Sequence, residues 1–216
     1  MLADDTQLEA FLNLFKTGTR LTYGKGEYII RPGESPAHIF YIEEGLVKAF
    51  NISKYGEENL LVIRKTHEIF PLIWAITGQG RSIIYQTLSP TTVVWRVDRE
   101  DFNEFLRKHP DVLYPFLDLI IQQYQMHSER ILNLEYRSVR ERLISFLLTM
   151  SLRFGEKTEE GILINVPLKQ QDIASSINAS RETTSREMSI LERKGLLRNY
   201  QSFITIKDKP ALKKLL

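Results

Sequence analysis

The stretch NASRETTSREMSILERKGLL, residues 178–197, decides the fold of this chain. Its first half is polar and carries Arg181 and Arg186, whereas its second half places apolar residues at helical spacing. The side chains at i, i+4 and i+7 that are expected to share the inner face of the helix are Thr184, Met188 and Leu191. The sequence therefore predicts a helix that packs along one face and exposes hydrogen-bonding groups near its beginning.

The preceding segment LKQQDIASSI, residues 168–177, predicts a shorter helix. Its expected inner face consists of Leu168, Ile173, Ala174 and Ile177. Asn178 can adopt the left-handed conformation that a tight turn requires, and Ser180 is a good N-terminal cap for the second helix. The segment GLLRNYQSFITI, residues 195–206, then predicts a β-hairpin. The order of these elements indicates two helices joined by a tight turn and followed by a hairpin.

The expected outward face of the second helix is Arg181, Glu182, Ser185, Arg186 and Ser189. A recognition helix presents the side chains of its N-terminal half to base edges in the major groove. Arginine can bond to guanine O6 and N7, and glutamate can accept from cytosine N4. A solvated helix with an i,i+4 ion pair is the alternative interpretation, but the flanking helix, turn and hairpin favour DNA binding.

The charge of the chain is unevenly distributed. Residues 1–136 contain 14 Lys and Arg against 18 Asp and Glu, a net charge of −4, and residues 137–216 contain 15 against 9, a net charge of +6. A basic C-terminal third on a mildly acidic body favours a polyanionic partner for that third.

Composition excludes several classes of site. The absence of cysteine excludes disulfides, thiolate metal sites and cysteine-ligated iron–sulfur clusters. The four histidines show no i,i+3 or i,i+4 pairing, so we expect no metal site. No apolar run approaches the roughly 18–20 residues that span a bilayer, and the opening MLADDTQLEAF does not read as a signal peptide. We therefore expect a cytoplasmic protein without a membrane partner.

Residues 21–97 have a different pattern, in which short runs of residues typical of β-strands are separated by Gly and Pro. EYIIRPGESPAHIFYIEEGLVKAF and SIIYQTLSPTTVVWRV are the clearest examples. Regular short strands with this punctuation predict an all-β barrel or sandwich.

A long helix is predicted after Pro110. Apolar and amphipathic residues recur along it at alternating intervals of four and three: Leu113, Leu117, Ile120, Tyr124, His127, Ile131 and Leu134. This heptad seam, held for about three heptads, indicates contact between helices. Because the obvious second helix is the same helix of another copy, the pattern predicts a homodimer.

SRETTSREMSILE after QQDIAS resembles the winged helix-turn-helix of the cyclic-AMP receptor protein/FNR (CRP/FNR) family of bacterial transcription regulators. YGKGEYIIRPGESPAHIFYIEEGLVKAF resembles the β-roll of that family, and the heptad helix resembles its dimerisation helix. The resemblance implies an α+β fold. A cyclic-nucleotide-binding-type β-roll (jelly roll) would occupy residues 1–109, the dimerisation helix residues 110–136 and the winged helix-turn-helix residues 137–216.

The resemblance also implies roles for individual residues. Arg181, Glu182 and Arg186 match the base-reading positions, and Ser180 and Thr183 would lie near phosphates. The remaining predicted DNA-binding residues are Ser185, on the outward face, and Lys169, as a phosphate contact. The DNA site would be a palindrome with TGTGA-like half-sites, and RNA polymerase would be a further partner.

An effector site is predicted between the β-roll and the long helix. Cyclic-AMP-binding relatives carry a Gly-Glu pair and an Arg-Ser or Arg-Thr pair, and THEIFPLIWAITGQGRSIIY, residues 66–85, has His67 in place of the glycine. The candidate lining for a small polar or anionic molecule is Glu68, Arg81, Ser82, His127 and Ser128. Cyclic AMP is disfavoured because His67 adds a side chain where the ribose-phosphate needs backbone contact. The bulky FPLIW segment could also fill the pocket and leave a regulator without a ligand.

Two other functional classes compete with a regulator. A cyclic-nucleotide-binding regulatory module would use the β-roll without binding DNA, but it needs no winged helix-turn-helix. A hydrolase is disfavoured because the sequence contains no G-x-S-x-G, HExxH or P-loop motif. We therefore expect a DNA-binding protein that is not an enzyme.

Overall fold

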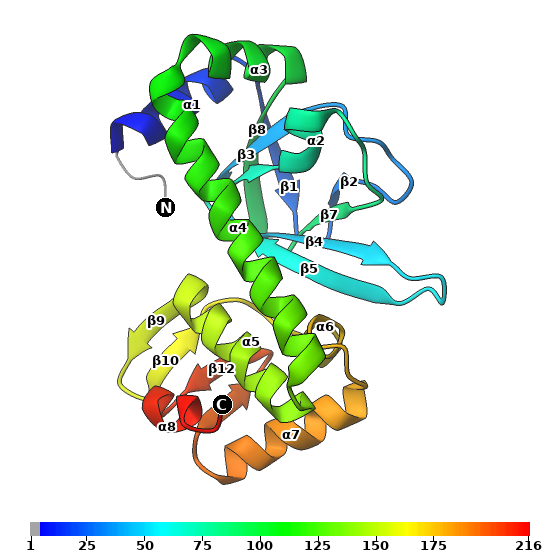
Figure 1. Ribbon diagram of the computed structural model, residues 1–216, viewed down its shortest axis with the longest axis vertical. Coiled ribbons are helices and arrows are strands. Elements are labelled where there is room, and N and C mark those ends of the chain that lie inside the picture. The colour runs from blue at the N-terminus through cyan, green and yellow to red at the C-terminus, as the bar shows by residue number, and fades with distance from the viewer. Residues whose placement is uncertain (1–4) are drawn as a thin grey trace. The chain divides into compact units, whose positions relative to one another are not determined.

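The computed structural model of the protein describes residues 5–216 and divides them into two compact units (Figure 1). The first unit comprises residues 5–52 and 61–126, and the second comprises residues 53–60 and 127–216. The short segment Ser53–Leu60 thus belongs to the C-terminal unit although it lies in the middle of the β-rich sequence.

The first unit begins with a helix and continues with short strands, two further helices and the start of a long one. The elements that lie wholly or partly in this unit are α1 (Asp5–Lys16), β1 (Thr19–Gly24), β2 (Tyr28–Ile30), β3 (Ile39–Glu44), β4 (Val47–Ile52), β5 (Glu58–Arg64), β6 (Ile69–Phe70), α2 (Leu72–Thr77), β7 (Ile84–Thr87), β8 (Thr91–Val97), α3 (Arg99–Lys108) and α4 (Pro110–Tyr136).

Two four-stranded sheets, in the orders β1-β8-β3-β6 and β2-β7-β4-β5, form the β-roll. The neighbouring strands pair antiparallel, with Tyr41 of β3 opposite Trp95 of β8 and Ala49 of β4 opposite Tyr85 of β7. This arrangement confirms the β-roll that the family resemblance implies.

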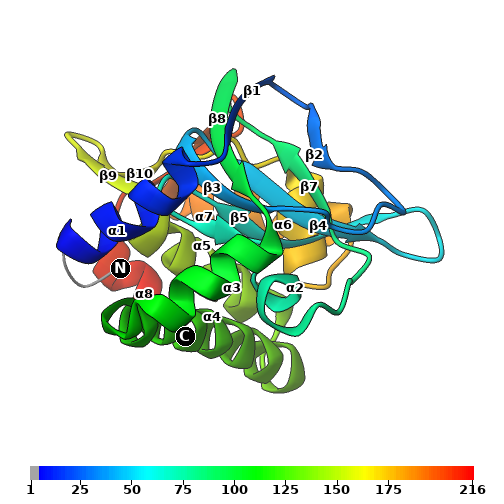
Figure 2. The ribbon, with the colours of Figure 1, turned by 90° about the horizontal axis from the view of Figure 1, so that it is seen from above.

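Alternation along β3 builds a core on each side of its sheet. Phe40 and Ile42 join the cluster between the two sheets, whereas Ile39 and Tyr41 join the cluster that includes α1, α3 and the start of α4. Because successive side chains of a strand point to opposite faces, a fully apolar strand is expected where both faces are covered. Figure 2 shows α1 and α3 beside the sheet that contains β3 and β8.

Gly45 connects β3 to β4 in a conformation that favours glycine. Its φ is +95°, and a Cβ atom at this position would lie 2.8 Å from the Thr91 carbonyl oxygen. Any larger residue would therefore force the turn away from the neighbouring strand.

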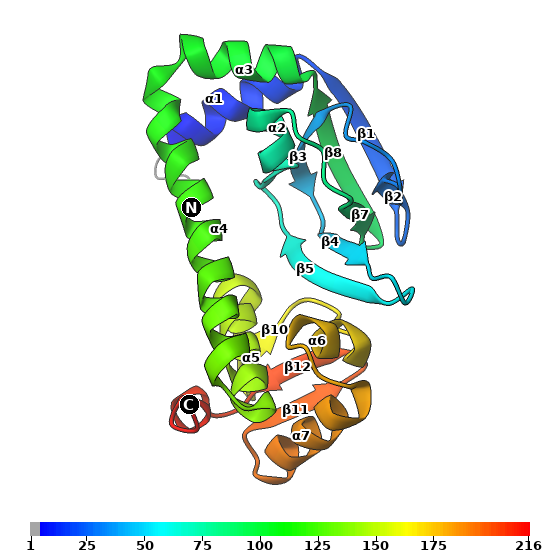
Figure 3. The same ribbon diagram turned by 45° about the vertical axis from the view of Figure 1, so that its right-hand side comes forward.

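The helix α4 runs without interruption from Pro110 to Tyr136 (Figure 3). Pro110 occupies its first position and Asp111 its first turn, where an acidic side chain complements the positive end of the helix dipole.

The second unit contains the segment 53–60, the end of α4 and a mixed α/β domain. Its further elements are α5 (Val139–Phe154), β9 (Gly155–Thr158), β10 (Gly161–Ile164), α6 (Gln170–Ser176), α7 (Arg181–Arg193), β11 (Leu197–Tyr200), β12 (Phe203–Ile206) and α8 (Lys209–Lys213). The four strands pair antiparallel in the order β11-β12-β10-β9. Among residues 5–216, no helix combines the length and apolar character needed to cross a membrane.

Candidate nucleic-acid interface

Helix α7 begins with the cap that the sequence predicts. The Ser180 Oγ accepts the backbone N–H of Thr183 at 3.1 Å, and the Thr184 hydroxyl donates to the Ser180 carbonyl at 2.9 Å. A capping serine satisfies one of the free N–H groups at a helix start. The N-terminus of α7 is therefore fixed by its own side chains.

The two faces of α7 have the predicted division. Thr184 and Leu191 are fully buried and Met188 nearly so. The exposed residues on the opposite side are Arg181, Glu182, Ser185, Arg186 and Ser189. The buried face thus holds the helix against its domain and leaves the polar face available to a partner.

The turn between α6 and α7 also agrees with the sequence prediction (Figure 3). Asn178 adopts a φ of +50°, and the Ala179 N–H donates to the Ala174 carbonyl at 3.0 Å. The predicted inner face of the first helix is buried at Leu168, Ile173, Ala174 and Ile177. The small side chain of Ala174 permits a close approach, so α6 and α7 form a compact helix-turn-helix.

The predicted hairpin consists of β11 and β12. Its two turn residues, Gln201 and Ser202, have φ values of +50° and +70°. Positive φ at both central residues is the pattern of a type I′ turn, whose twist suits a two-residue hairpin. The Leu168 N–H donates to the Ser202 carbonyl at 2.8 Å, which joins this wing to the segment before α6.

Two tethers of α7 were not predicted from the sequence. The Glu187 carboxylate accepts from Arg140 Nε of α5 at 2.7 Å, and the Glu192 carboxylate accepts from the Asn199 N–H of β11 at 2.6 Å. Glu187 is largely buried in its pair. Because Arg140 and Glu187 are separated by 47 positions, local periodicity carries no signal for this contact.

The start of α7 carries an acidic side chain, Glu182, and the start of α6 a basic one, Lys169, so the two can bind different groups of a partner. Hydrogen bonding from its own backbone N–H, followed by the Ser180 hydroxyl, lowers the pKa of Glu182, which favours an ionised acceptor at the start of α7. Lys169 is exposed directly before α6, and its N–H donates to the Asp172 carboxylate at 3.2 Å. Its ammonium group therefore extends from a fixed backbone position.

The predicted effector residues are divided between the units. Glu68, Arg81 and Ser82 belong to the first unit, and His127 and Ser128 to the second. Arg81 and Ser82 are exposed, whereas Glu68 is largely buried and pairs with Arg64 at 3.4 Å.

Arg64 is a buried cation of the first unit that sequence reasoning missed. Its Nη2 donates to the Gln123 side chain of α4 at 2.9 Å, and its Nε has no hydrogen-bond partner. The sequence pattern of the strand shows that position 64 carries a positive charge but does not show that the side chain is buried. Its burial depends on the packing of the folded unit.

The interior of the roll near these residues is occupied by aromatic rings. Phe70 of the FPLIW segment stacks on Phe40 at 5.3 Å and on Tyr85 at 4.7 Å between ring centroids. His67 has a φ of +69°, and its Nδ1 lies 2.5 Å from the Tyr41 hydroxyl. Burial, followed by the charge of Glu43, raises the pKa of Tyr41 to about 12, so this phenol stays neutral. The exposed His67 residue therefore contacts Tyr41 on the helix-covered side of the β3 sheet, and not the rings between the two sheets.

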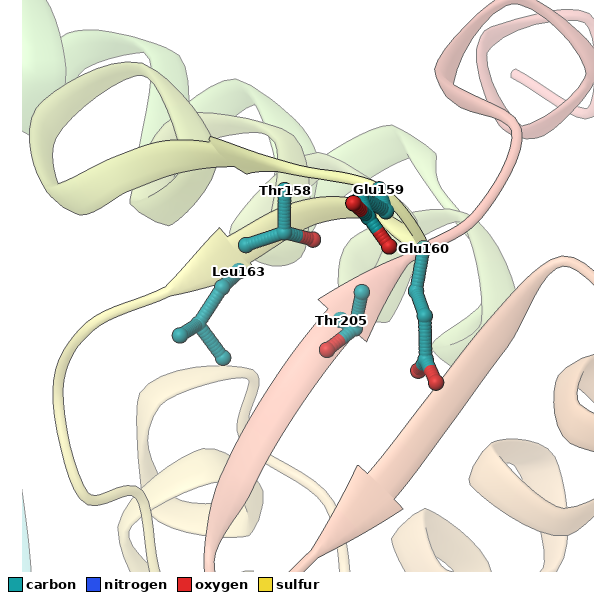
Figure 4. Close-up of a pocket in the computed structure, with 5 residues that line it drawn as sticks. All are labelled: Thr158, Glu159, Glu160, Leu163 and Thr205. Atoms are coloured by element: carbon teal, nitrogen blue, oxygen red, sulfur yellow. The ribbon is translucent and has the colours of Figure 1, made fainter.

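A shallow hollow of about 380 Å³ lies on the sheet of the second unit (Figure 4). Its lining residues are Thr158, Glu159, Glu160, Leu163 and Thr205. The Glu160 carboxylate also pairs with Arg198 at 2.7 Å. The carboxylates of this turn would repel DNA phosphates. The hollow is therefore not part of the proposed DNA-binding face of α7.

A β-roll followed by a helix-turn-helix and a wing defines a class of DNA-binding transcription regulators. A sequence profile for the Crp-like helix-turn-helix domain matches residues 141–215, and one for the cyclic nucleotide-binding domain matches residues 20–109. The chain belongs to the CRP/FNR family of transcription regulators and is not an enzyme.

Curated relatives agree with this membership. The global nitrogen regulator of Synechocystis sp. is 26% identical over 192 residues, which cover 88% of this chain and 85% of the relative. The fumarate and nitrate reduction regulatory protein of Escherichia coli K12 is 22% identical over 191 residues, covering 88% and 76%.

Solved structures show the same fold. A CooA mutant from Carboxydothermus hydrogenoformans has a TM-score of 0.79 at 21% identity and covers 98% of this chain and 96% of its own. FixK2 from Bradyrhizobium japonicum has a TM-score of 0.78 at 20% identity, with coverage of 92% and 96%.

Proposed function

We propose that this regulator is a homodimer that reads a palindromic DNA site through the exposed N-terminal half of α7. The observation that carries the proposal is the division of α7 into a fully buried face and an exposed face with Arg181, Glu182 and Arg186. A buried face fixes the helix, so the outward side chains can be held in a defined register against base edges.

The proposed contacts differ in what they contribute. Arg181 and Arg186 would bond to guanine O6 and N7, and Glu182 would accept from cytosine N4. Ser180, Thr183, Ser185 and the Lys169 ammonium would bind phosphates or neighbouring edges and fix the register. By family resemblance, the half-sites would be TGTGA-like.

The homodimer is supported by the exposed apolar side chains of α4. These include Leu113, Leu117, Ile121, Tyr124, Ile131 and Leu132. Ile120, which the heptad seam includes, packs instead against the core of the first unit, and Leu134 is half-buried. An apolar stripe of this length on one helix favours pairing with the same helix of a second copy.

A salt-dependent gel shift tests this function. We expect a complex with duplex DNA whose affinity falls linearly on a log–log plot as salt rises, because phosphate contacts release counterions. A chain that binds cyclic nucleotides but shows no salt-dependent DNA binding would instead be a regulatory module without DNA.

The proposed effector is a small polar or anionic molecule in the β-roll, with Glu68, Arg81 and Ser82 as first-unit contacts. Cyclic AMP is disfavoured, since His67 replaces the family glycine and Phe70 fills part of the interior. Calorimetry with cyclic AMP and cyclic GMP tests this part. Micromolar binding of cyclic AMP that is lost in Arg81→Ala would support Arg81 as an effector contact and would contradict the argument against cyclic AMP. Tight DNA binding without ligand would support a ligand-independent regulator.

We infer further that RNA polymerase is a protein partner and that the regulator acts in the cytoplasm. Family membership supports both inferences. A pull-down of purified RNA polymerase with the DNA-bound regulator tests the first, and fractionation with an epitope-tagged chain tests the second.

A further inference from the structure

Arg130, near the end of α4, lies at the centre of a polar cluster in the second unit. Its Nη1 donates to the Leu60 carbonyl at 3.1 Å, and its Nη2 to the Asn59 side chain at 3.4 Å and to the Ser175 carbonyl at 3.5 Å. Three segments that are far apart in sequence thus meet at one guanidinium, because its planar group presents several donors in fixed directions.

Leu60 completes the cluster from the other side. Its N–H donates to the Ser175 Oγ at 3.2 Å, and this hydroxyl donates in turn to the Asp172 carbonyl of α6 at 3.0 Å. Both backbone groups of Leu60 are therefore engaged, one with α6 and the other with Arg130. Leu60 is buried, so losing either partner would leave a polar group without compensation.

The turn before Leu60 is internally fixed. The Ser53 Oγ accepts the N–H groups of Tyr55 and Glu57, both at 3.2 Å, and the Ser53 N–H donates to the Glu57 carbonyl at 2.8 Å. A turn held by its own hydrogen bonds presents Asn59 and Leu60 in a defined position, so it can serve as a support rather than a loose loop.

The end of α4 also contacts α5. Asn133 donates to the Ser145 hydroxyl of α5 at 2.8 Å. This bond joins α4 to α5, whereas the Arg130 cluster joins α6 to the segment Ser53–Leu60 and to α4. The turn at Asn178 couples α6 to α7, which is also tethered to α5 and to β11. The position of α6 therefore contributes to where the base-reading side chains lie.

We propose that Arg130 is a positioning residue for DNA reading, which clamps α6 to α4 and to the segment Ser53–Leu60 without touching DNA. The proposal rests on the DNA-binding function proposed above and assigns one means by which it is controlled. The segment Ser53–Leu60 lies inside the residues 20–109 that match the cyclic nucleotide-binding domain. Through Arg130 it becomes part of the support of α7.

The first experiment measures DNA affinity of the full-length protein with Arg130→Ala and Arg130→Lys. We expect both variants to lose roughly 10-fold or more in affinity for the selected palindrome, as hydrogen bonds to a charged group are removed. Lysine keeps the charge but cannot satisfy several acceptors at once, so it is not expected to rescue. Arg107→Ala, an exposed arginine of α3, controls for the loss of one positive charge.

Salt dependence separates positioning from direct contact. In Arg130→Ala the slope of log affinity against log salt should equal that of the wild type, whereas loss of a phosphate contact would reduce it by about 0.9. A reduced slope, full rescue by Arg130→Lys, or unchanged affinity in Arg130→Ala would each overturn the proposal.

Hydrogen exchange tests the cluster without DNA. The amides of residues 170–177 should exchange faster in Arg130→Ala than in the wild type, and the effects of Arg130→Ala and Ser175→Ala should be non-additive because both act through Leu60. Unchanged exchange would contradict the clamp even if the protein bound no DNA, so the two proposals fail separately. Asn59→Ala and Ser175→Ala keep the guanidinium and test the same cluster if Arg130→Ala does not fold.

Discussion

Helices α4 and α7 both expose one face, but the chemistry of those faces differs. The exposed face of α4 carries large apolar side chains such as Leu117, Tyr124 and Ile131, and that of α7 carries Arg181, Glu182 and Arg186. Exposed apolar surface gains free energy when another apolar surface covers it, whereas arginine and glutamate can remain hydrated or pair with base edges. The same secondary structure therefore points to a protein partner in one helix and to DNA in the other.

The largest expected effect comes from placing a charge on the apolar face of α4. Ile131 is 62% exposed in the single chain, so Ile131→Asp should fold but resist burial between two copies. We expect a monomer that binds the palindrome roughly 100- to 10,000-fold more weakly, since both half-sites no longer act together. Light scattering and a gel shift measure the two properties.

A matched control lies on another helix. Leu152 of α5 is 76% exposed, and Leu152→Asp should leave both the dimer and DNA affinity unchanged. A dimeric Ile131→Asp variant, or a wild type that is monomeric at micromolar concentration, would contradict the proposal that the apolar face of α4 pairs two copies.

Removing an arginine from the polar face of α7 should have the next largest effect. Arg181→Ala and Arg186→Ala should each cost about 1–3 kcal/mol on the selected site and relax the base preference at one position. Arg193→Ala, an exposed arginine in the last turn of the same helix, is the control and should keep the preference. Variants whose selected sequences match those of the wild type would contradict base reading by these residues.

Lys169→Ala should have a smaller and less selective effect. If the Lys169 ammonium binds a phosphate, its loss should weaken all duplexes alike and reduce the slope of log affinity against log salt by about 0.9. Affinity measured at several salt concentrations for the palindrome and for a random duplex distinguishes this outcome. A loss confined to the palindrome would assign Lys169 to base contact instead.

The smallest expected effect concerns the charge of Glu182. Its pKa in the folded chain is lowered below the usual value of 4.5, so the charged form stabilises the helix start above 4.5 and this contribution disappears as pH falls through the folded value. Glu182→Gln should therefore unfold at a slightly lower temperature than the wild type near neutral pH, and the difference should vanish in acid. A difference that persists in acid would show that it does not come from the carboxylate charge.

Much of α7 and its turn could be predicted because the relevant signals are local. Ser180, Thr184 and Asn178 act within four positions along the chain, where capping, helical periodicity and left-handed turns are set by residue type. The heptad seam of α4 was less complete, because the core of the first unit covers Ile120 and leaves Ile121 exposed. The periodicity of the sequence identifies the apolar face of the helix, but packing in the folded unit decides which residues at the margin of that face are exposed.

The contacts that support α7 could not be predicted in this way. Arg130 meets Leu60 across 70 positions, and Arg140 meets Glu187 across 47. The first pair depends on how β5 and α4 come together and the second on how α5 packs against α7, which no local pattern encodes. The position of His67 beside Tyr41 is similar, since the sequence marks the missing glycine but not the ring that the histidine contacts.

Selection of the wild-type protein against a random duplex library tests the central claim most directly. If two copies read DNA through α7, the recovered sequences should form an inverted repeat, with half-site centres about 10–10.5 base pairs or one turn apart. Recovery of a single unrepeated motif, or of no sequence preference at all, would contradict the proposal that a dimer presents the polar face of α7 to bases.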